Sequence, residues 1–363
     1  MHRLAAFVLV AGALLLAVAC SGGSKPGPTE VAQDAEITGD PFLVGTPQTR
    51  ASIGDVDRAF SRYEATRSDL IELFKEQPWF QDGLTRDESL FVERSLTFVA
   101  SYSGPRTAYV SDAAIRDKLY RYDKISLSKG ETELLLIYEP GQNGDREMAL
   151  IKGVLPELET VVGAEFPERM MTVVNGAFEI NDFNEGQFIR IARCCTLTAF
   201  VLAHELAHSY WSVGPSWFNE GMADIYATLA LARLNDNPPA GWTSFPADIE
   251  SYYKSKKQQL DAGRFPDMTL PRRLASDGLY EVADVFLLDI RKQLGDEAFR
   301  AAARDIYLAS DYGRFNLRDK RIEDIFLSRA RANAREPIMT SFNRAIWGDN
   351  GERYDRLRER EGP

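Results

Sequence analysis

The chain has 363 residues, enough for one large domain or two smaller ones with a buried core. Hydrophobic residues make up 44% and charged residues 27% of it, which excludes a mostly disordered chain. The formal net charge is −11, whereas a protein that binds nucleic acid normally carries a basic face, so we expect no nucleic-acid partner. Three cysteines allow at most one disulfide, which excludes a disulfide-rich scaffold.

The first 19 residues have the pattern of a secretory signal peptide. Arg3 precedes an apolar run over residues 4–19, which is shorter than the roughly 20 residues of a transmembrane helix. The ending Ala17-Val18-Ala19 before Cys20 resembles a bacterial lipobox, in which the cysteine is lipidated after cleavage. This resemblance implies an extracytoplasmic lipoprotein that is anchored to a membrane through Cys20. Plain secretion after an Ala-x-Ala cut and an uncleaved anchor are the alternatives.

The next segment, residues 20–51, predicts a flexible tether because small, polar and helix-breaking residues dominate its start. From Ser52 onward, apolar residues recur near helical spacing. We therefore predict a helical N-terminal region over residues 52–130. Its expected helices cover residues 52–77, 85–102 and 111–122.

Strand and helix patterns then alternate. The aliphatic run within residues 133–139 predicts a buried strand, and the amphipathic stretch 145–162 predicts a helix with a kink or break at Pro156. Asn175-Gly176 favours a hairpin turn beside expected strands. Those strands cover residues 170–174 and 187–192, further helices cover 245–260, 297–309, 319–332 and 337–347, and a charged tail covers 349–363.

Residues 196–213 have helical composition and contain the segment His204-Glu205-Leu206-Ala207-His208. Two histidines four residues apart lie about 40° apart around a helix, so both imidazoles can bind one metal ion. Glu205 can then reach a water molecule that the metal activates and accept its proton. The spacing predicts one zinc ion on His204 and His208. The alternative is a helix with two surface histidines and no metal.

A third ligand is predicted on the helix that follows Gly214-Pro215-Ser216. Glu220 and Asp224 lie four residues apart and share one face, so one can bind zinc while the other accepts a hydrogen bond from a ligand histidine. The neighbouring Trp217-Phe218 pair indicates a buried helix start, where an unpaired charge is costly, rather than two solvated carboxylates. We predict Glu220 as the ligand because its side chain is longer, and Asp224, about 6 Å further along the axis, as the partner of a histidine.

These two segments together resemble the gluzincin metallopeptidases, and most nearly the aminopeptidase N family and bacterial peptidase-MA-like proteins. The resemblance implies that His204, His208 and Glu220 bind a single zinc ion and that Glu205 is the general base. Asp224 is similar to the aspartate of the thermolysin pattern, which implies that it holds His204.

Two further segments are similar to parts of the aminopeptidases. Residues 279–299 resemble a helix pair that begins with a tyrosine and contains a Leu-Gly turn, which implies that Tyr280 donates to the oxyanion. The alternative is a core tyrosine. Gly176-Ala177-Phe178-Glu179 is similar to a substrate-binding strand segment, but the hairpin turn is the favoured interpretation. Aminopeptidase and endopeptidase activity therefore both stay open.

The sequence predicts an α+β fold that is mainly helical. Residues 131–348 are expected to form a gluzincin-like catalytic domain, with a small β-sheet packed on the helix that carries the two histidines. The predicted function is a zinc-dependent peptidase that acts on peptide or protein substrates outside the cytoplasm. The alternative is an inactive relative that binds peptide, cell-wall material or a partner protein, against which the intact Glu205 argues. Cys194-Cys195 is expected to form a vicinal disulfide or two thiols without a catalytic role.

Overall fold

The computed structural model describes residues 68–101, 110–178, 183–192, 198–243, 245, 248–261 and 280–347. The predicted signal peptide, Cys20, the tether and the charged tail lie outside these residues, as does Cys194-Cys195. Within the described ranges, none of the helices combines the length and the apolar character that crossing a membrane requires.

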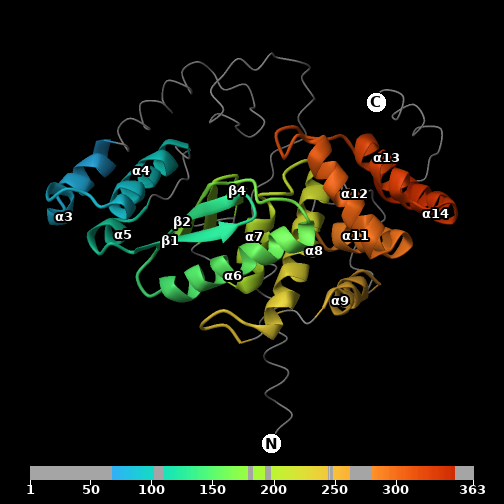
Figure 1. The fold of residues 1–363 in the computed structure, drawn as a ribbon, viewed down its shortest axis with the longest axis horizontal. Coiled ribbons are helices and arrows are strands. Elements are labelled where there is room, and N and C mark those ends of the chain that lie inside the picture. Colours follow the sequence, from blue (N-terminus) through green and yellow to red (C-terminus); the bar gives the residue numbers. More distant parts are fainter. Residues whose placement is uncertain are drawn as a thin grey trace, which may run out of the picture.

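The described chain is mainly helical and contains one small sheet (Figure 1). Residues 68–75 are helical. The labelled α-helices are α3 (Pro78–Gln81), α4 (Arg86–Ser101), α5 (Asp112–Arg116), α6 (Gly144–Val162), α7 (Ala199–Ala207), α8 (Ser216–Arg233), α9 (Ile249–Asp261), α11 (Tyr280–Leu294), α12 (Asp296–Ala309), α13 (Asp319–Arg329) and α14 (Ala332–Phe342). Short turns of other helix types are η1 (Leu234–Asp236) and η2 (Asn343–Trp347). The strands are β1 (Tyr120–Leu127), β2 (Gly130–Tyr138), β3 (Met170–Phe178), β4 (Phe183–Glu185) and β5 (Phe188–Ala192).

The sheet is mixed, with the strand order β1-β2-β3-β5-β4. β1 and β2 form an antiparallel hairpin, β3 pairs in parallel with both β2 and β5, and β4 pairs antiparallel with β5. The predicted helix over residues 111–122 is wrong in its second half. α5 ends at Arg116, Lys118 takes a left-handed φ of 48° that stops the helix, and β1 begins two residues later. The region predicted as helical, residues 52–130, therefore also contains β1, and the hairpin crosses the expected boundary with the catalytic domain.

Both faces of the sheet are covered, which explains the continuous aliphatic run in β2. Leu135 and Ile137 belong to one apolar cluster with Phe91 of α4, so the N-terminal helices cover this face. Leu134 and Leu136 belong to the larger cluster, which contains side chains of α6, α7, α8 and α11. In Figure 1 the sheet accordingly lies between the N-terminal helices and the C-terminal helices. The N-terminal helices therefore complete the core of the sheet.

The predicted hairpin turn at Asn175-Gly176 is wrong. β3 continues to Phe178, and its pairing with β5 shifts register between Asn175 and Phe178. Gly176 has a φ of 88° in this irregularity, and a Cβ there would lie 2.7 Å from Cγ of Glu139. Glycine is thus required by the irregularity in an internal strand, and over these residues β3 is not at the edge of the sheet.

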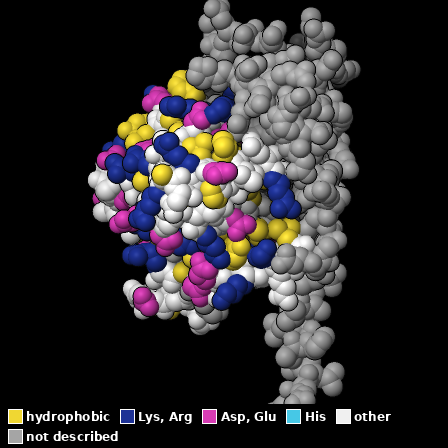
Figure 2. All heavy atoms as spheres, turned by 90° about the vertical axis from the view of Figure 1, so that its right-hand side faces the viewer, with side chains coloured by type: hydrophobic (Ala, Val, Ile, Leu, Met, Phe, Trp, Pro, Cys, Tyr) yellow, Lys and Arg dark blue, Asp and Glu magenta, His cyan; other side chains and the backbone are white. Residues whose placement is uncertain are grey.

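α8 is the central helix of the C-terminal half and packs against α6, α7, α9 and α11. The helices predicted in this half are present with shifted ends, and Pro156 lies inside an unbroken α6. The predicted helix at 337–347 instead begins at Ala332 as α14. Figure 2 shows the side of the molecule on which α13 and α14 lie, where Lys and Arg side chains alternate with Asp and Glu.

At Gly221, α8 lies against α11 without room for a side chain. A Cβ on Gly221 would lie 2.7 Å from Cδ1 of Leu287 and 3.2 Å from the backbone carbonyl carbon of Ala283. The leucine can rotate away, but the backbone can move only if the two helices separate. We expect Gly221→Ala to lower the free energy of unfolding by about 1–3 kcal/mol, despite the higher helix propensity of alanine. Urea denaturation measures this, and an unchanged midpoint would contradict the close approach.

Candidate metal centre

α7 begins at a well-defined cap and is shorter than the sequence predicted. The Oγ1 of Thr198 accepts a hydrogen bond of 3.1 Å from the Val201 N–H, which caps the first turn. The helix ends at Ala207 rather than at Val213. Beyond it, Tyr210 and Trp211 are fully buried, and this packing bends the chain into turns.

His208 nevertheless keeps its helical position relative to His204. It is the C-cap of α7, with φ −61° and ψ −17°, and its N–H still donates to the His204 carbonyl over 3.1 Å. The i, i+4 arrangement of the two imidazoles is therefore preserved although the second histidine lies at the very end of the helix.

Asn219 joins the loop after α7 to the first turn of α8. Its Oδ1 accepts hydrogen bonds from the Val213 N–H (3.1 Å) and the Gly214 N–H (2.9 Å). Its Nδ2 donates to the Gly214 carbonyl (2.8 Å). The loop and the helix start are thereby held together, and this fixes the position of the adjacent Glu220. No separate role for Asn219 was predicted from the sequence.

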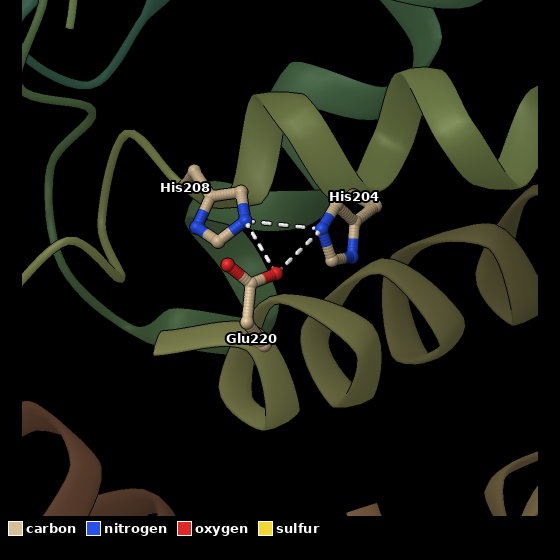
Figure 3. Close-up of side chains that lie close together, drawn as sticks. All are labelled: His204, His208 and Glu220. Atoms are coloured by element: carbon tan, nitrogen blue, oxygen red, sulfur yellow. Dashed lines mark hydrogen bonds and ion pairs between the residues drawn. The ribbon is translucent and has the colours of Figure 1, made fainter. Parts of the chain in front are cut away.

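The three predicted metal ligands converge on one point (Figure 3). Nε2 of His204 and Nε2 of His208 lie 3.0 Å apart. Oε2 of Glu220 lies 3.3 Å from the former and 3.2 Å from the latter. Zinc binds nitrogen and oxygen ligands at about 2.0–2.2 Å in a tetrahedron, whose ligand atoms are then about 3.3–3.6 Å apart. The triangle formed by these residues is therefore close to the size that such an ion requires.

Hydrogen bonds at the other ring nitrogens leave both Nε2 lone pairs available for a metal ion. Nδ1 of His204 lies 2.5 Å from Oδ1 of Asp224, and Nδ1 of His208 lies 3.3 Å from the Trp211 carbonyl oxygen. Because each Nδ1 faces an acceptor, it carries the proton of the neutral imidazole. Asp224 thus occupies the place predicted for it. The partner of His208, a backbone carbonyl in the turn, has no sequence signal.

The electrostatics of the cluster favour a cation. Although burial by itself raises the pKa of Glu220, the charges and hydrogen bonds of the two histidines hold that pKa well below its ordinary value. Burial likewise opposes a charge on His204, but the carboxylates of Asp224, Glu220 and Glu205 hold its pKa well above the usual value. A zinc ion would supply the positive charge that a proton otherwise provides. The donor set and its charge therefore fit zinc.

The structure describes the side chain of one predicted catalytic residue, Glu205, but not that of the other, Tyr280. Glu205 is 5% exposed on α7, and its carbonyl oxygen accepts a hydrogen bond from Nδ2 of Asn184 in β4, so sheet and helix are joined beside the centre. Tyr280 is the first residue of α11, but its side chain lies outside the described part, and its role stays a prediction.

A further set of polar side chains lies behind Asp224 and was not singled out from the sequence. It consists of Tyr252 and Lys256 on α9 and Asp284 on α11. Tyr252 and Lys256 are four residues apart, and Asp284 follows Tyr280 by four, so only their spacing could have suggested a shared face. Their burial against α8 is a property of the tertiary structure.

Neither a protein-family model nor a curated protein sequence matches this chain. Solved structures similar to it include an M1 zinc metallopeptidase from Deinococcus radiodurans, with 16% sequence identity and a TM-score of 0.48 over 61% of this chain and 51% of that one. Aminopeptidase A from Legionella pneumophila, in complex with aspartic acid, is 16% identical with a TM-score of 0.45 over 61% and 28% of the two chains. The chain thus spans about half the length of the first structure and less of the second.

Proposed function

We propose that this protein is a zinc-dependent peptidase that hydrolyses peptide bonds outside the cytoplasm. The observation that carries the proposal is the convergence of three ligand atoms within 3.0–3.3 Å of one another, with both histidine Nδ1 atoms engaged elsewhere. A buried glutamate follows the first ligand directly in the chain. This combination suits hydrolysis, since a purely structural zinc site has no need of a base.

His204, His208 and Glu220 would hold the ion. When bound, zinc lowers the pKa of a water molecule and polarises a substrate carbonyl. Glu205 accepts the proton of the attacking water and later passes it to the leaving amine. Tyr280 is proposed as the donor to the oxyanion.

The chemistry can be tested with the purified full-length protein. We expect about one zinc per chain by elemental analysis, and cleavage of a mixed peptide library that a chelator abolishes and added zinc restores. Mass spectrometry of the products distinguishes removal of terminal residues from internal cleavage. One bound zinc without any cleavage would favour the inactive, peptide- or partner-binding alternative.

The membrane location is proposed from the sequence alone. We expect Cys20→Ala to leave the folded protein intact and to abolish lipidation, because the thiol of Cys20 is the expected attachment point of the lipid. Metabolic labelling with a fatty-acid probe, followed by fractionation of cells, measures the effect. Equal labelling of the variant and the unaltered protein would contradict the lipoprotein assignment.

A further inference from the structure

The carboxylate of Asp224 is held at both of its oxygens. Oδ1 faces Nδ1 of His204, and Oδ2 lies 3.1 Å from the hydroxyl of Tyr252. The same hydroxyl lies 2.7 Å from Oδ2 of Asp284, and Nζ of Lys256 lies 3.4 Å from that oxygen. Asp224 is 5% exposed and Asp284 is 0% exposed, so bulk water has little access to either carboxylate. Three helices, α8, α9 and α11, meet in this group.

The available protons decide which carboxylate each donor serves. A tyrosine hydroxyl has one proton, so Tyr252 can donate to only one of the two carboxylates at a time. The Lys256 ammonium group has three, and it forms ion pairs with Asp284 and, over 3.6 Å, with Glu281. Because Lys256 also serves Asp284, the hydroxyl proton of Tyr252 is available to Asp224.

We propose that Tyr252 is a positioning residue: its hydroxyl locks the Asp224 carboxylate against His204 and thereby raises the affinity of the centre for zinc. Lys256 sustains this role by holding Asp284. The inference rests on the proposed metal centre, since it concerns the group that orients one ligand of that centre. A rigid carboxylate keeps the proton on Nδ1 and aims the Nε2 lone pair at the ion.

Tyr252→Phe removes the hydroxyl and retains the ring, which stacks on Phe200 with 6.2 Å between the ring centres. We expect the dissociation constant for zinc to rise about 10-fold, in the range found when partners of metal-binding histidines are removed. Competition with a fluorescent zinc chelator measures this constant on the full-length protein, and circular dichroism confirms the fold.

Tyr253→Phe is the matched control. The Tyr253 hydroxyl donates to Oδ1 of Asp289 over 2.7 Å and so joins the same two helices, α9 and α11, without contacting Asp224. We expect this variant to bind zinc as tightly as the unaltered protein does. An unchanged constant for Tyr252→Phe, or an equal weakening in both variants, would overturn the proposal, because helix packing rather than positioning would then explain the result.

Lys256→Met keeps the test decisive if Tyr252→Phe does not fold. Without the ammonium group, the single hydroxyl proton of Tyr252 has to serve both carboxylates, so its hold on Asp224 weakens. We expect weaker zinc binding by at least about 3-fold, and unchanged binding would count against the proposal. If the unaltered protein itself binds no zinc, both the metal centre and the inference fail. Zinc binding that none of the substitutions alters refutes the inference alone.

Discussion

Glu205→Gln is expected to retain zinc and to lose turnover by about 10²- to 10⁴-fold. Glutamine has nearly the shape of glutamate but cannot accept a proton from water at neutral pH. None of the three converging ligand atoms belongs to residue 205, so the metal content should not change. Peptide cleavage and elemental analysis on the same preparation measure the two quantities independently.

Glu88→Gln provides the control for this exchange. Glu88 is 8% exposed and lies on α4. This helix covers the face of the sheet opposite to the helices that carry the candidate metal centre. Its carboxylate accepts hydrogen bonds from Thr85 at the start of that helix, and the amide oxygen of glutamine can still do so. We expect this variant to cleave at the rate of the unaltered protein. Cleavage by Glu205→Gln at the same rate would show that Glu205 is not the base.

Glu220→Ala is expected to be isolated without zinc, whereas Asp224→Ala should take up zinc when the metal is in excess. Oε2 of Glu220 lies within 3.3 Å of both histidine Nε2 atoms, so its loss removes one of three ligands. Asp224 contacts His204 on the opposite ring nitrogen, and its removal should weaken zinc affinity by roughly 10- to 100-fold.

Zinc stoichiometry by elemental analysis, before and after addition of zinc, separates the two roles. Asp289→Ala serves as a control, because this aspartate also accepts a tyrosine hydrogen bond between α9 and α11 but does not contact Asp224 or the ligands. Circular dichroism establishes that each variant is folded. Full zinc in Glu220→Ala together with loss of zinc from Asp224→Ala would reverse the assignment. Full zinc in both would place the third ligand elsewhere.

The sequence by itself determined the local part of the candidate centre. The spacing of His204 and His208, and of Glu220 and Asp224, follows from the geometry of a single helix, so each pair could be placed on one face without knowledge of the fold. The buried strand β2 was also predictable, because a short aliphatic run that ends at Pro140-Gly141 is typical of a buried strand.

Only the tertiary structure decided how these local pieces meet. The end of α7 at Ala207 results from the burial of Tyr210 and Trp211, and Gly176 belongs to a register shift against β5 rather than to a turn. Both depend on partners distant in the sequence. The contact of Tyr252 with Asp224 likewise joins residues 28 positions apart, on helices whose packing no local pattern encodes. Spacing along one element is set by the geometry of the backbone, whereas contacts between elements are set by how whole side-chain surfaces fit together.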